Sequence, residues 1–277
     1  MGEISEALRR ARGDDPARKA QAAEPRPIDP GRPASPAPPP TPAGERIESP
    51  PRTREGIWSP RALFVEDHGP AAESARHLAL RLRAELERRR ARSVAVVSAL
   101  HSEGKTTVAG NLAFALCSLT PGRSVALIDC DLRRPTLAKA LGIDVRVGID
   151  DVIAGDAALA DARISFDTPP LDVYLVRKPR AAAHELLVRP SLDATIRELE
   201  RLYTHVVFDT APILLVPDTP ILLERLSACV AVARAGHSRT KAFHRMCELV
   251  PAGKMVGAVL DEGRLPAAAE SYRYYEQ

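Results

Sequence analysis

The segment ALHSEGKTT, residues 99–107, places a lysine and two threonines directly after a glycine and closely behind the apolar run SVAVVS at 93–98. A strand that ends in a tight loop and opens a helix points several backbone N–H groups, and the positive end of the helix, at one place. A polyphosphate fits that place, with Lys105 on the β- and γ-phosphates and the Thr106 hydroxyl on Mg²⁺. The sequence therefore predicts a nucleotide-binding loop made of Ser102, Glu103, Gly104, Lys105, Thr106 and Thr107.

This loop departs from the full Walker A pattern at two positions. The pattern has a glycine five residues before Gly104, where this chain has Ala99, and Ser102 stands where glycine is common. Taken alone, the loop can also be read as a chance Gly-Lys-Thr at the start of a helix.

Carboxylates follow two other apolar runs. Asp129 and Asp131 close VALIDCD, and Asp209 closes VVFD. In a parallel sheet such strand ends meet at the edge where ligands bind, although each aspartate singly could be a strand-end cap. Three acids beside a phosphate site need a hard cation to offset their repulsion. We expect Thr106, Asp129 and Asp209 to hold Mg²⁺, and we take Lys105, Asp129, Asp131 and Asp209 as candidate catalytic residues.

The end of the chain, SYRYYEQ, concentrates tyrosines. Three of the five tyrosines of the sequence, Tyr272, Tyr274 and Tyr275, lie in its last six residues. No periodic apolar run surrounds them, so packing cannot use their rings. The alternatives are a chemical role for the phenols, or an inert or partner-docking end.

The elements that must position these residues follow from the apolar pattern. Strand-like runs at 93–98, 124–129, 173–177, 205–209, 229–235 and 255–260 alternate with helical stretches at 71–91, 105–119, 184–202 and 239–249. Near-continuous apolar strands separated by helices indicate a mostly parallel sheet with both faces covered. We therefore expect an α/β fold, a three-layer doubly wound sheet of the P-loop NTPase type.

The remaining segments differ in composition. Residues 1–12 have a short amphipathic pattern, and residues 13–60 hold about half of the prolines with almost no apolar periodicity. We expect a short helix at 1–12, a disordered Pro-rich linker at 13–60, a P-loop domain at 61–265 and a flexible tyrosine-bearing tail at 266–277.

Composition limits the partners and the compartment. The formal net charge of +3 is small for 277 residues, so we expect no nucleic-acid partner. The four cysteines show no C-x-x-C spacing, which favours buried thiols in a reducing cytoplasm. No apolar stretch is long enough for a secretory signal or a membrane span, so we expect a cytoplasmic protein.

The order EGKTT, ALIDCDLRRP, VVFDTAP and a tyrosine-bearing tail resembles the bacterial tyrosine kinases of capsule and exopolysaccharide synthesis, over residues 63 to 277. The resemblance implies ATP and Mg²⁺ as cofactors, and autophosphorylation of Tyr272, Tyr274 and Tyr275. Because the tail is far from the phosphate loop along the chain, we expect transfer in trans. Phosphates on the tail would repel one another, which we expect to loosen the assembly and cycle polymer export.

The resemblance also implies partners. Glu73 and Arg76 match two positions of an E-x-x-R-x-x-R pattern that joins neighbours into a ring, and Ala79 departs from its third position. Asp261 stands where the family has an Asn that reads adenine; it can accept a hydrogen bond from the adenine amino group but cannot donate one to N7. A separate membrane polysaccharide co-polymerase is the implied activator, and it would recruit the protein to the inner face of the membrane.

Two other readings are open. A partition or division-site ATPase is a nucleotide-driven switch of similar fold, but its loop carries a lysine four residues before the glycine, where this chain has Leu100. A nucleotide-binding adaptor that has lost catalysis is the second, given the departures at Ala79, Ser102, Ala211 and Asp261.

Overall fold

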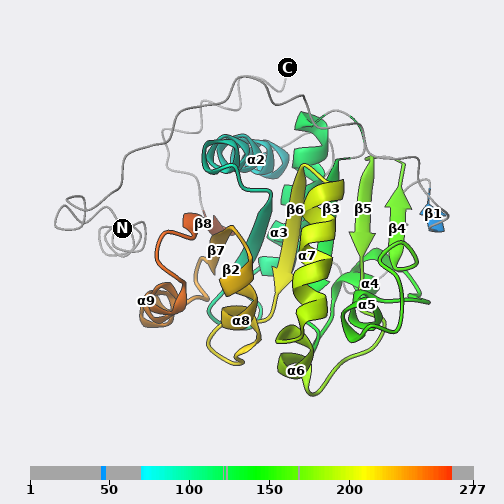
Figure 1. Cartoon of the computed structure of the whole chain (residues 1–277). Coiled ribbons are helices and arrows are strands. Elements are labelled where there is room, and N and C mark those ends of the chain that lie inside the picture. Colours follow the sequence, from blue (N-terminus) through cyan, green and yellow to red (C-terminus); the bar gives the residue numbers. More distant parts are fainter. Residues whose placement is uncertain (1–44, 48–69, 121, 123, 168, 264–277) are drawn as a thin grey trace, which may run out of the picture.

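The sheet at the centre of the molecule has eight strands. In the computed structural model, which describes residues 45–47, 70–120, 122, 124–167 and 169–263, their order is β1-β4-β5-β3-β6-β2-β7-β8 (Figure 1). Neighbouring strands run parallel except β4 and β5, which are antiparallel. The strands are β1 (Glu45–Ile47), β2 (Ser93–Ser98), β3 (Val125–Cys130), β4 (Arg163–Phe166), β5 (Leu171–Tyr174), β6 (His205–Thr210), β7 (Ala228–Arg234) and β8 (Met255–Asp261).

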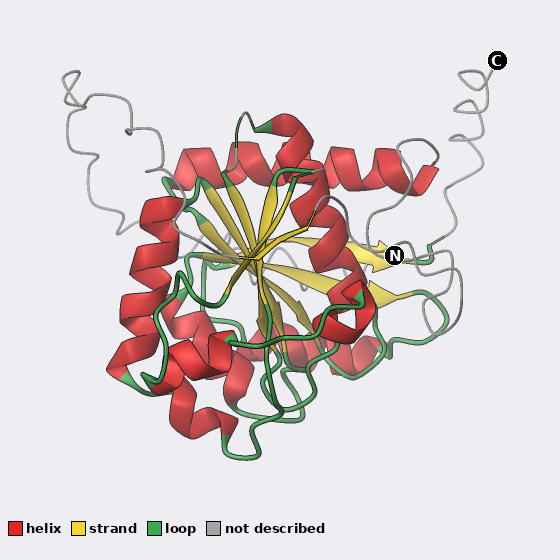
Figure 2. Ribbon diagram, turned by 90° about the vertical axis from the view of Figure 1, so that its right-hand side faces the viewer, coloured by secondary structure: helices red, strands yellow, loops and turns green. Residues whose placement is uncertain are grey.

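Helices cover both faces of this sheet, as Figure 2 shows. They are α2 (Pro70–Arg89), α3 (Lys105–Leu119), α4 (Leu137–Leu141), α5 (Ile149–Ala154), α6 (Ala183–Leu187), α7 (Pro190–Leu202), α8 (Asp218–Arg225) and α9 (Thr240–Leu249). One buried apolar cluster joins the sheet to α2, α3 and α4, and the other joins it to α5 through α9. This arrangement confirms the expected three-layer, mostly parallel α/β fold.

The strands that carry the site are buried along their whole length. Every residue of β2, β3 and β6 is buried, as the near-continuous apolar runs predict for a sheet covered on both faces. The bounds of β2 and α3 agree with the expected 93–98 and 105–119.

The helix expected over 184–202 is broken in two. Leu187 ends α6, with Val188 as its C-cap, and Pro190 begins α7, with Arg189 before it in an extended conformation (φ −70°, ψ 147°). A proline ring disfavours the helical conformation in the residue before it, and it suits the first position of a new helix. The break therefore follows from Pro190, and the single helix was a wrong prediction.

Several short elements were not expected from the sequence: β1, β4, α4, α5 and α8. The strand β1 lies within the segment that we expected to be a linker, and it pairs with β4 at one edge of the sheet. The expected helix at 1–12, the rest of the linker and the tail at 266–277 lie outside the described residues.

The helix α2 lies against α3 through its apolar stripe, in which Ala79, Leu82 and Leu86 are buried. Its C-terminal arginines are bonded within the fold, because Arg89 donates to Glu85 and to the carbonyl of Gly253. Among the described residues, no helix combines the length and the apolar character that crossing a bilayer requires.

Candidate active site

The site lies at the carboxyl ends of β2, β3 and β6. Because β6 separates β2 from β3 in the sheet, the chain crosses over β6 between the phosphate loop and the next strand. Asp129 of β3 and Asp209 of β6 are direct partners in the register of the two strands. The carboxyl ends of parallel strands on either side of such a crossover form the crevice where ligands bind in α/β sheets.

The phosphate loop turns tightly between β2 and α3. Gly104 has φ +90° and directly precedes Lys105, the first residue of α3, so the positive end of that helix opens at the loop. Ser102 also has a positive φ, +61°, a conformation that costs a residue with a Cβ about 1–2 kcal/mol. The preference for glycine at position 102 thus has a structural reason.

Lys105 lies among the predicted carboxylates. Its ammonium group is 3.5 Å from Asp131 Oδ2, and its side chain is 12% exposed. The other oxygen of Asp131 accepts the backbone N–H of Arg134 at 3.0 Å. The backbone N–H of Asp131 in turn donates to Asp129 Oδ1 at 3.1 Å. These bonds fix the directions of both carboxylates.

Three carboxylate oxygens of the site are buried without a hydrogen-bond partner among the described residues: Asp129 Oδ2 and both side-chain oxygens of Asp209. Burial, followed by the charges of Asp209 and Asp131, raises the pKa of Asp129 well above its ordinary value. Burial also raises the pKa of Asp209 to about 6, although Lys105 and the neighbouring Thr106 hydroxyl lower it. Buried carboxylates are normally paired or bind a metal, so this donor set fits a hard cation.

The threonines of the loop occupy the first turn of α3. The Thr106 hydroxyl is 3.4 Å from that of Thr136, on the loop before α4, and it lies near Asp209. Thr107 is half-buried one residue further along α3. Thr106 is therefore placed beside the buried carboxylates, as the predicted Mg²⁺ site requires.

Glu103 has a different environment from the rest of the loop. Its side chain is 1% exposed, with one oxygen accepting the N–H of Leu100 at 2.6 Å and the other accepting the hydroxyl of Ser238. Both oxygens thus hold the loop in shape. The side chain of Glu103 is thus part of the loop's internal support, and its place among the nucleotide-binding residues, through its backbone N–H, stays a prediction.

The last residue of β7 also supports the loop. Arg234 donates to the carbonyl of Ser102 at 3.1 Å and pairs with Glu262 just after β8. Asp261 lies against Gly104, since a Cβ added to Gly104 would be 2.3 Å from an Asp261 carboxylate oxygen. The last described residues of the chain therefore lie beside the phosphate loop.

The two tyrosines of the described domain are not available as acceptors. Tyr174 and Tyr203 are buried, their hydroxyls are 2.8 Å apart, and Tyr203 donates to Asp172. Burial raises the pKa of both phenols above the ordinary value. The candidate acceptors Tyr272, Tyr274 and Tyr275 lie outside the described residues.

The candidate oligomerisation residues lie in the first turns of α2. Glu73 and Arg76 form an ion pair with each other, and each keeps about a third or more of its side-chain surface exposed (53% and 32%). Ala79, the third position of the pattern, is fully buried against the domain. The structure brings Glu73 and Arg76 to the surface, and their role in assembly stays a prediction.

One arginine close to the site had no assigned role. Arg133, within the quoted DLRRP, binds both oxygens of Asp218, which lies 85 residues away in the sequence. The two adjacent arginines of DLRRP are the feature of the sequence that could have drawn attention to Arg133. Their spacing gives no indication that Asp218 is the partner.

Comparison with known proteins shows which proteins this chain is similar to. No protein-family model matches the chain. It is 31% identical to the tyrosine-protein kinase YwqD of Bacillus subtilis (strain 168) over 189 residues, which are 68% of this chain and 78% of YwqD. It is 26% identical over 212 residues, 74% of its length, to the succinoglycan biosynthesis transport protein ExoP of Rhizobium meliloti (strain 1021), of which it spans only 26%. The solved VpsO kinase domain matches with a TM-score of 0.62 at 27% identity, covering 70% of this chain and 96% of that domain.

Proposed function

The chain belongs to the bacterial tyrosine-protein kinases, and from this premise we propose that it is an ATP-dependent autokinase that phosphorylates tyrosines of its own C-terminal segment. The observation that carries the proposal is the group of carboxylates beside Lys105. Asp129, Asp131 and Asp209 converge at the carboxyl edge of the sheet, and three of their buried oxygens have no hydrogen-bond partner among the described residues. Such a group is costly unless a cation and a phosphate complete it.

In the proposed reaction the loop and the lysine bind ATP. The backbone N–H groups of Ser102 to Thr107 and the ammonium of Lys105 hold the phosphates, while Thr106, Asp129 and Asp209 would hold Mg²⁺. The cation, when bound, offsets the negative charge on the phosphate oxygens. The fixed directions of these side chains hold the γ-phosphate for in-line attack.

Asp131 is the better placed of the two aspartates that could accept the proton. Its carboxylate faces Lys105 and is 4% exposed, whereas Asp129 is fully buried and keeps an oxygen for the cation. The phenol oxygen forms its bond to the γ-phosphorus as the bond to the β–γ bridging oxygen breaks. ADP leaves, and the phenol proton passes to Asp131.

The acceptors are the tail tyrosines. Among the five tyrosines, Tyr174 and Tyr203 are excluded by burial and by their hydrogen bonds, which leaves Tyr272, Tyr274 and Tyr275. Each phosphate adds nearly two negative charges to the tail. We propose that the accumulated charge loosens the assembly and so regulates polysaccharide synthesis and export.

The proposal extends to partners and place of action. The name of ExoP joins biosynthesis and transport of a polysaccharide in one protein. We propose that a separate membrane polysaccharide co-polymerase activates this kinase and recruits it to the cytoplasmic face of the membrane, through α2 or the N-terminal segment. Copies of the chain would associate through Glu73 and Arg76.

The test is to incubate the purified protein with Mg-ATP, with and without the candidate co-polymerase, and to map phosphate by mass spectrometry. We expect label on Tyr272, Tyr274 or Tyr275 that disappears in Lys105→Met. ATP hydrolysis with an unmodified tail would support the nucleotide-switch reading instead. Neither hydrolysis nor label, even with the co-polymerase, would support the adaptor reading.

A further inference from the structure

The loop that follows Asp129 of β3 and carries Asp131 is anchored at its next charged residue. Leu132 follows Asp131, and its side chain is fully buried. The backbone carbonyl of Leu132 accepts the N–H of Arg180 at 2.7 Å. Arg133 follows, and it is the point at which the loop contacts α6 and α8. The orientation of the two aspartates therefore depends on what holds Arg133.

Arg133 uses four of its five N–H donors within the protein. Its Nε and one Nη bind the two oxygens of Asp218 at 2.7 and 3.1 Å. The other Nη donates to the carbonyl of Ala181. The Nη that binds Asp218 also lies 3.1 Å from His184 Nδ1. A planar guanidinium with two parallel bonds to a carboxylate fixes orientation as well as distance, which a lysine cannot do.

Asp218 lies on the segment that follows the other acid-bearing strand. It is the first residue of α8, is 1% exposed, and comes nine residues after Asp209 in the sequence. The hydroxyl of the next residue, Thr219, donates to the carbonyl of Ala211 at 2.6 Å, which closes this segment back onto the end of β6. The Arg133–Asp218 pair thus joins the loop after β3, which carries Asp131, to the segment that follows Asp209 and β6.

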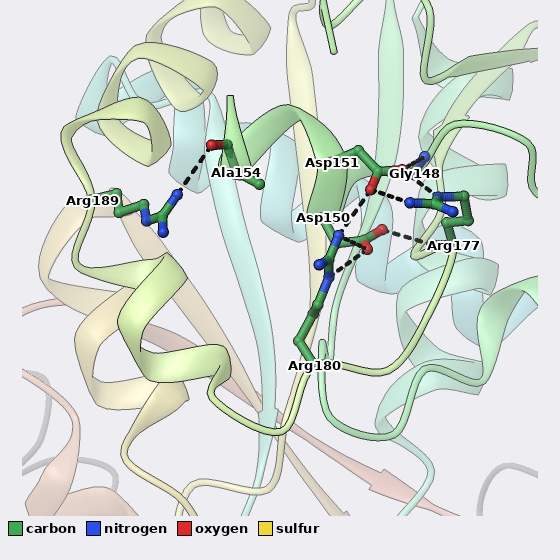
Figure 3. Close-up of polar contacts among 7 residues, drawn as sticks. All are labelled: Gly148, Asp150, Asp151, Ala154, Arg177, Arg180 and Arg189. Atoms are coloured by element: carbon green, nitrogen blue, oxygen red, sulfur yellow. Dashed lines mark hydrogen bonds and ion pairs between the residues drawn. The ribbon is translucent and has the colours of Figure 1, made fainter. Parts of the chain in front are cut away.

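The third contact of Arg133 is itself held firmly. Ala181 follows Arg180, whose guanidinium binds Asp150 and Asp151 at the start of α5. Arg177 binds the same carboxylates, through its side chain to Asp151 and through its backbone N–H to Asp150 (Figure 3). The segment 177–181 is therefore a fixed support for Arg133.

We propose that the Arg133–Asp218 ion pair is a positioning pair. It holds the loop after β3, from which the Asp131 N–H orients the Asp129 carboxylate, and it thereby sets the affinity of the site of Asp129 and Asp209 for a divalent cation. This inference rests on the proposed role of those two aspartates as metal ligands. Neither Arg133 nor Asp218 touches the nucleotide in this scheme. Residues that orient metal ligands change metal affinity by about 10- to 100-fold when they are replaced.

The test measures cation binding directly. Mn²⁺ binding to the protein–ADP complex is followed by electron paramagnetic resonance, and ADP binding without metal is measured by calorimetry. We expect Arg133→Gln to weaken Mn²⁺ binding about tenfold while the metal-free affinity for ADP stays within about twofold. Asp218→Asn should do the same, and the double variant should lose little more than either single one because the pair acts as a unit.

Controls separate this inference from general disruption and from the proposed function. Arg225→Gln breaks a second Arg–Asp pair, at the far end of α8, in which Arg225 Nε lies 3.0 Å from Asp193 Oδ1. This variant should leave Mn²⁺ binding unchanged. If Arg133→Gln does not fold, Arg133→Lys, which keeps the charge and loses the paired bonds, should show the same selective loss. Loss of Mn²⁺ binding in Asp209→Asn but wild-type binding in the Arg133 and Asp218 variants would overturn this inference alone. An Asp209→Asn variant that binds Mn²⁺ normally would overturn the metal site itself.

Discussion

Asp261 is the residue at which this chain departs most clearly from the pattern that it resembles, since an Asn that reads adenine stands there in the family. The structure places its carboxylate against Gly104 of the phosphate loop. A negative charge at that point opposes the binding of a polyphosphate. The substitution therefore bears on phosphate affinity as well as on the recognition of the base.

Replacing Asp261 by Asn tests this electrostatic effect. We expect ADP to bind about three- to tenfold more tightly, because the repulsion that is removed is on the order of 1 kcal/mol at a solvated site. The gain should shrink at high salt, which screens the repulsion. Calorimetry at two ionic strengths measures both effects. Glu248→Gln, at an exposed carboxylate near the C-terminal end of α9, is the matched control and should leave the affinity for ADP unchanged. Equal affinities in Asp261→Asn and the wild type would exclude the repulsion.

His205 gives the domain a predictable response to acid. Its side chain begins β6, at the opposite end of the strand from the site, and is 3% exposed with Nδ1 lacking a partner among the described residues. Burial lowers its pKa; Glu87 acts in the opposite direction, and Arg83 and Arg92 lower the pKa further. The unfolded chain therefore binds a proton at this histidine before the folded protein does.

The sign of the pH dependence follows from that order. The free energy of unfolding should be unaffected by His205 above its unfolded pKa of about 6.5 and should fall as the pH drops through that value towards the folded pKa. The slope from one proton is at most about 1.4 kcal/mol per pH unit. Urea unfolding at neutral and at mildly acidic pH should show a smaller loss in His205→Gln than in the wild type. His77→Gln, at an exposed histidine of α2, should behave as the wild type does.

At the scale of helices and strands, the sequence predicts elements whose signals are local. The run SVAVVS and the following Gly-Lys-Thr define β2 and the start of α3, and both bounds agree with the structure. The apolar pattern continues on both sides of Pro190 and therefore predicts one helix, although the proline itself indicates the break. The strand β4 has four residues and is defined by its antiparallel pairing with β5, which no periodicity within RISF reveals.

In the candidate site, too, some contacts follow from local signals in the sequence and others depend on residues far along the chain. The approach of Lys105 to Asp131 and of Asp129 to Asp209 follows from the rule that parallel strands share a carboxyl edge. The pairing of Arg133 with Asp218 depends on where α8 begins, and α8 is not among the elements that the sequence predicts. The inward direction of Glu103 depends in the same way on Ser238, which is 135 residues further along the chain.

The start of α5 provides a stability test at this scale. Gly148 precedes α5, and a Cβ there would be 2.2 Å from Asp150 Oδ1 and 2.4 Å from the backbone nitrogen of Arg177. Gly148→Ala must therefore push apart the cluster in Figure 3, at an expected cost of about 1–3 kcal/mol. Urea unfolding checks the value. Gly257→Ala in β8, where a Cβ meets nothing within 4 Å, is the control, and equal losses in the two variants would contradict the packing argument.

At the scale of the whole molecule, the end of the described chain bears on the route of phosphate transfer. The distance of the tail from the phosphate loop along the sequence predicts transfer in trans. The structure shows that β8 ends beside that loop, with Asp261 against Gly104 and Glu262 joined to Ser102 through Arg234. Tyr272 lies nine residues beyond Gly263, which can span at most about 30 Å. The distance therefore permits a chain to reach its own site, and trans transfer needs another argument.

The direction of attack favours transfer between copies. The phenol must approach the γ-phosphate in line with the bond that breaks, and so from the side away from ADP. The described chain ends just after Glu262, which is joined through Arg234 to the loop that grips the phosphates, and a short segment from there would have to turn back around the nucleotide to attack its own ATP. A neighbour's tail has no such constraint, so we still expect transfer between copies.

Mixing two variants decides between the two routes. Lys105→Met supplies tails without activity, and a chain with Tyr272, Tyr274 and Tyr275 all replaced by Phe supplies activity without acceptors. With Mg-ATP and the co-polymerase, trans transfer should place phosphate on the tail of the Lys105→Met chain, at a rate that rises with the concentration of the active chain. An unlabelled Lys105→Met tail, beside wild-type chains that label themselves at a rate independent of concentration, would instead establish transfer within one chain.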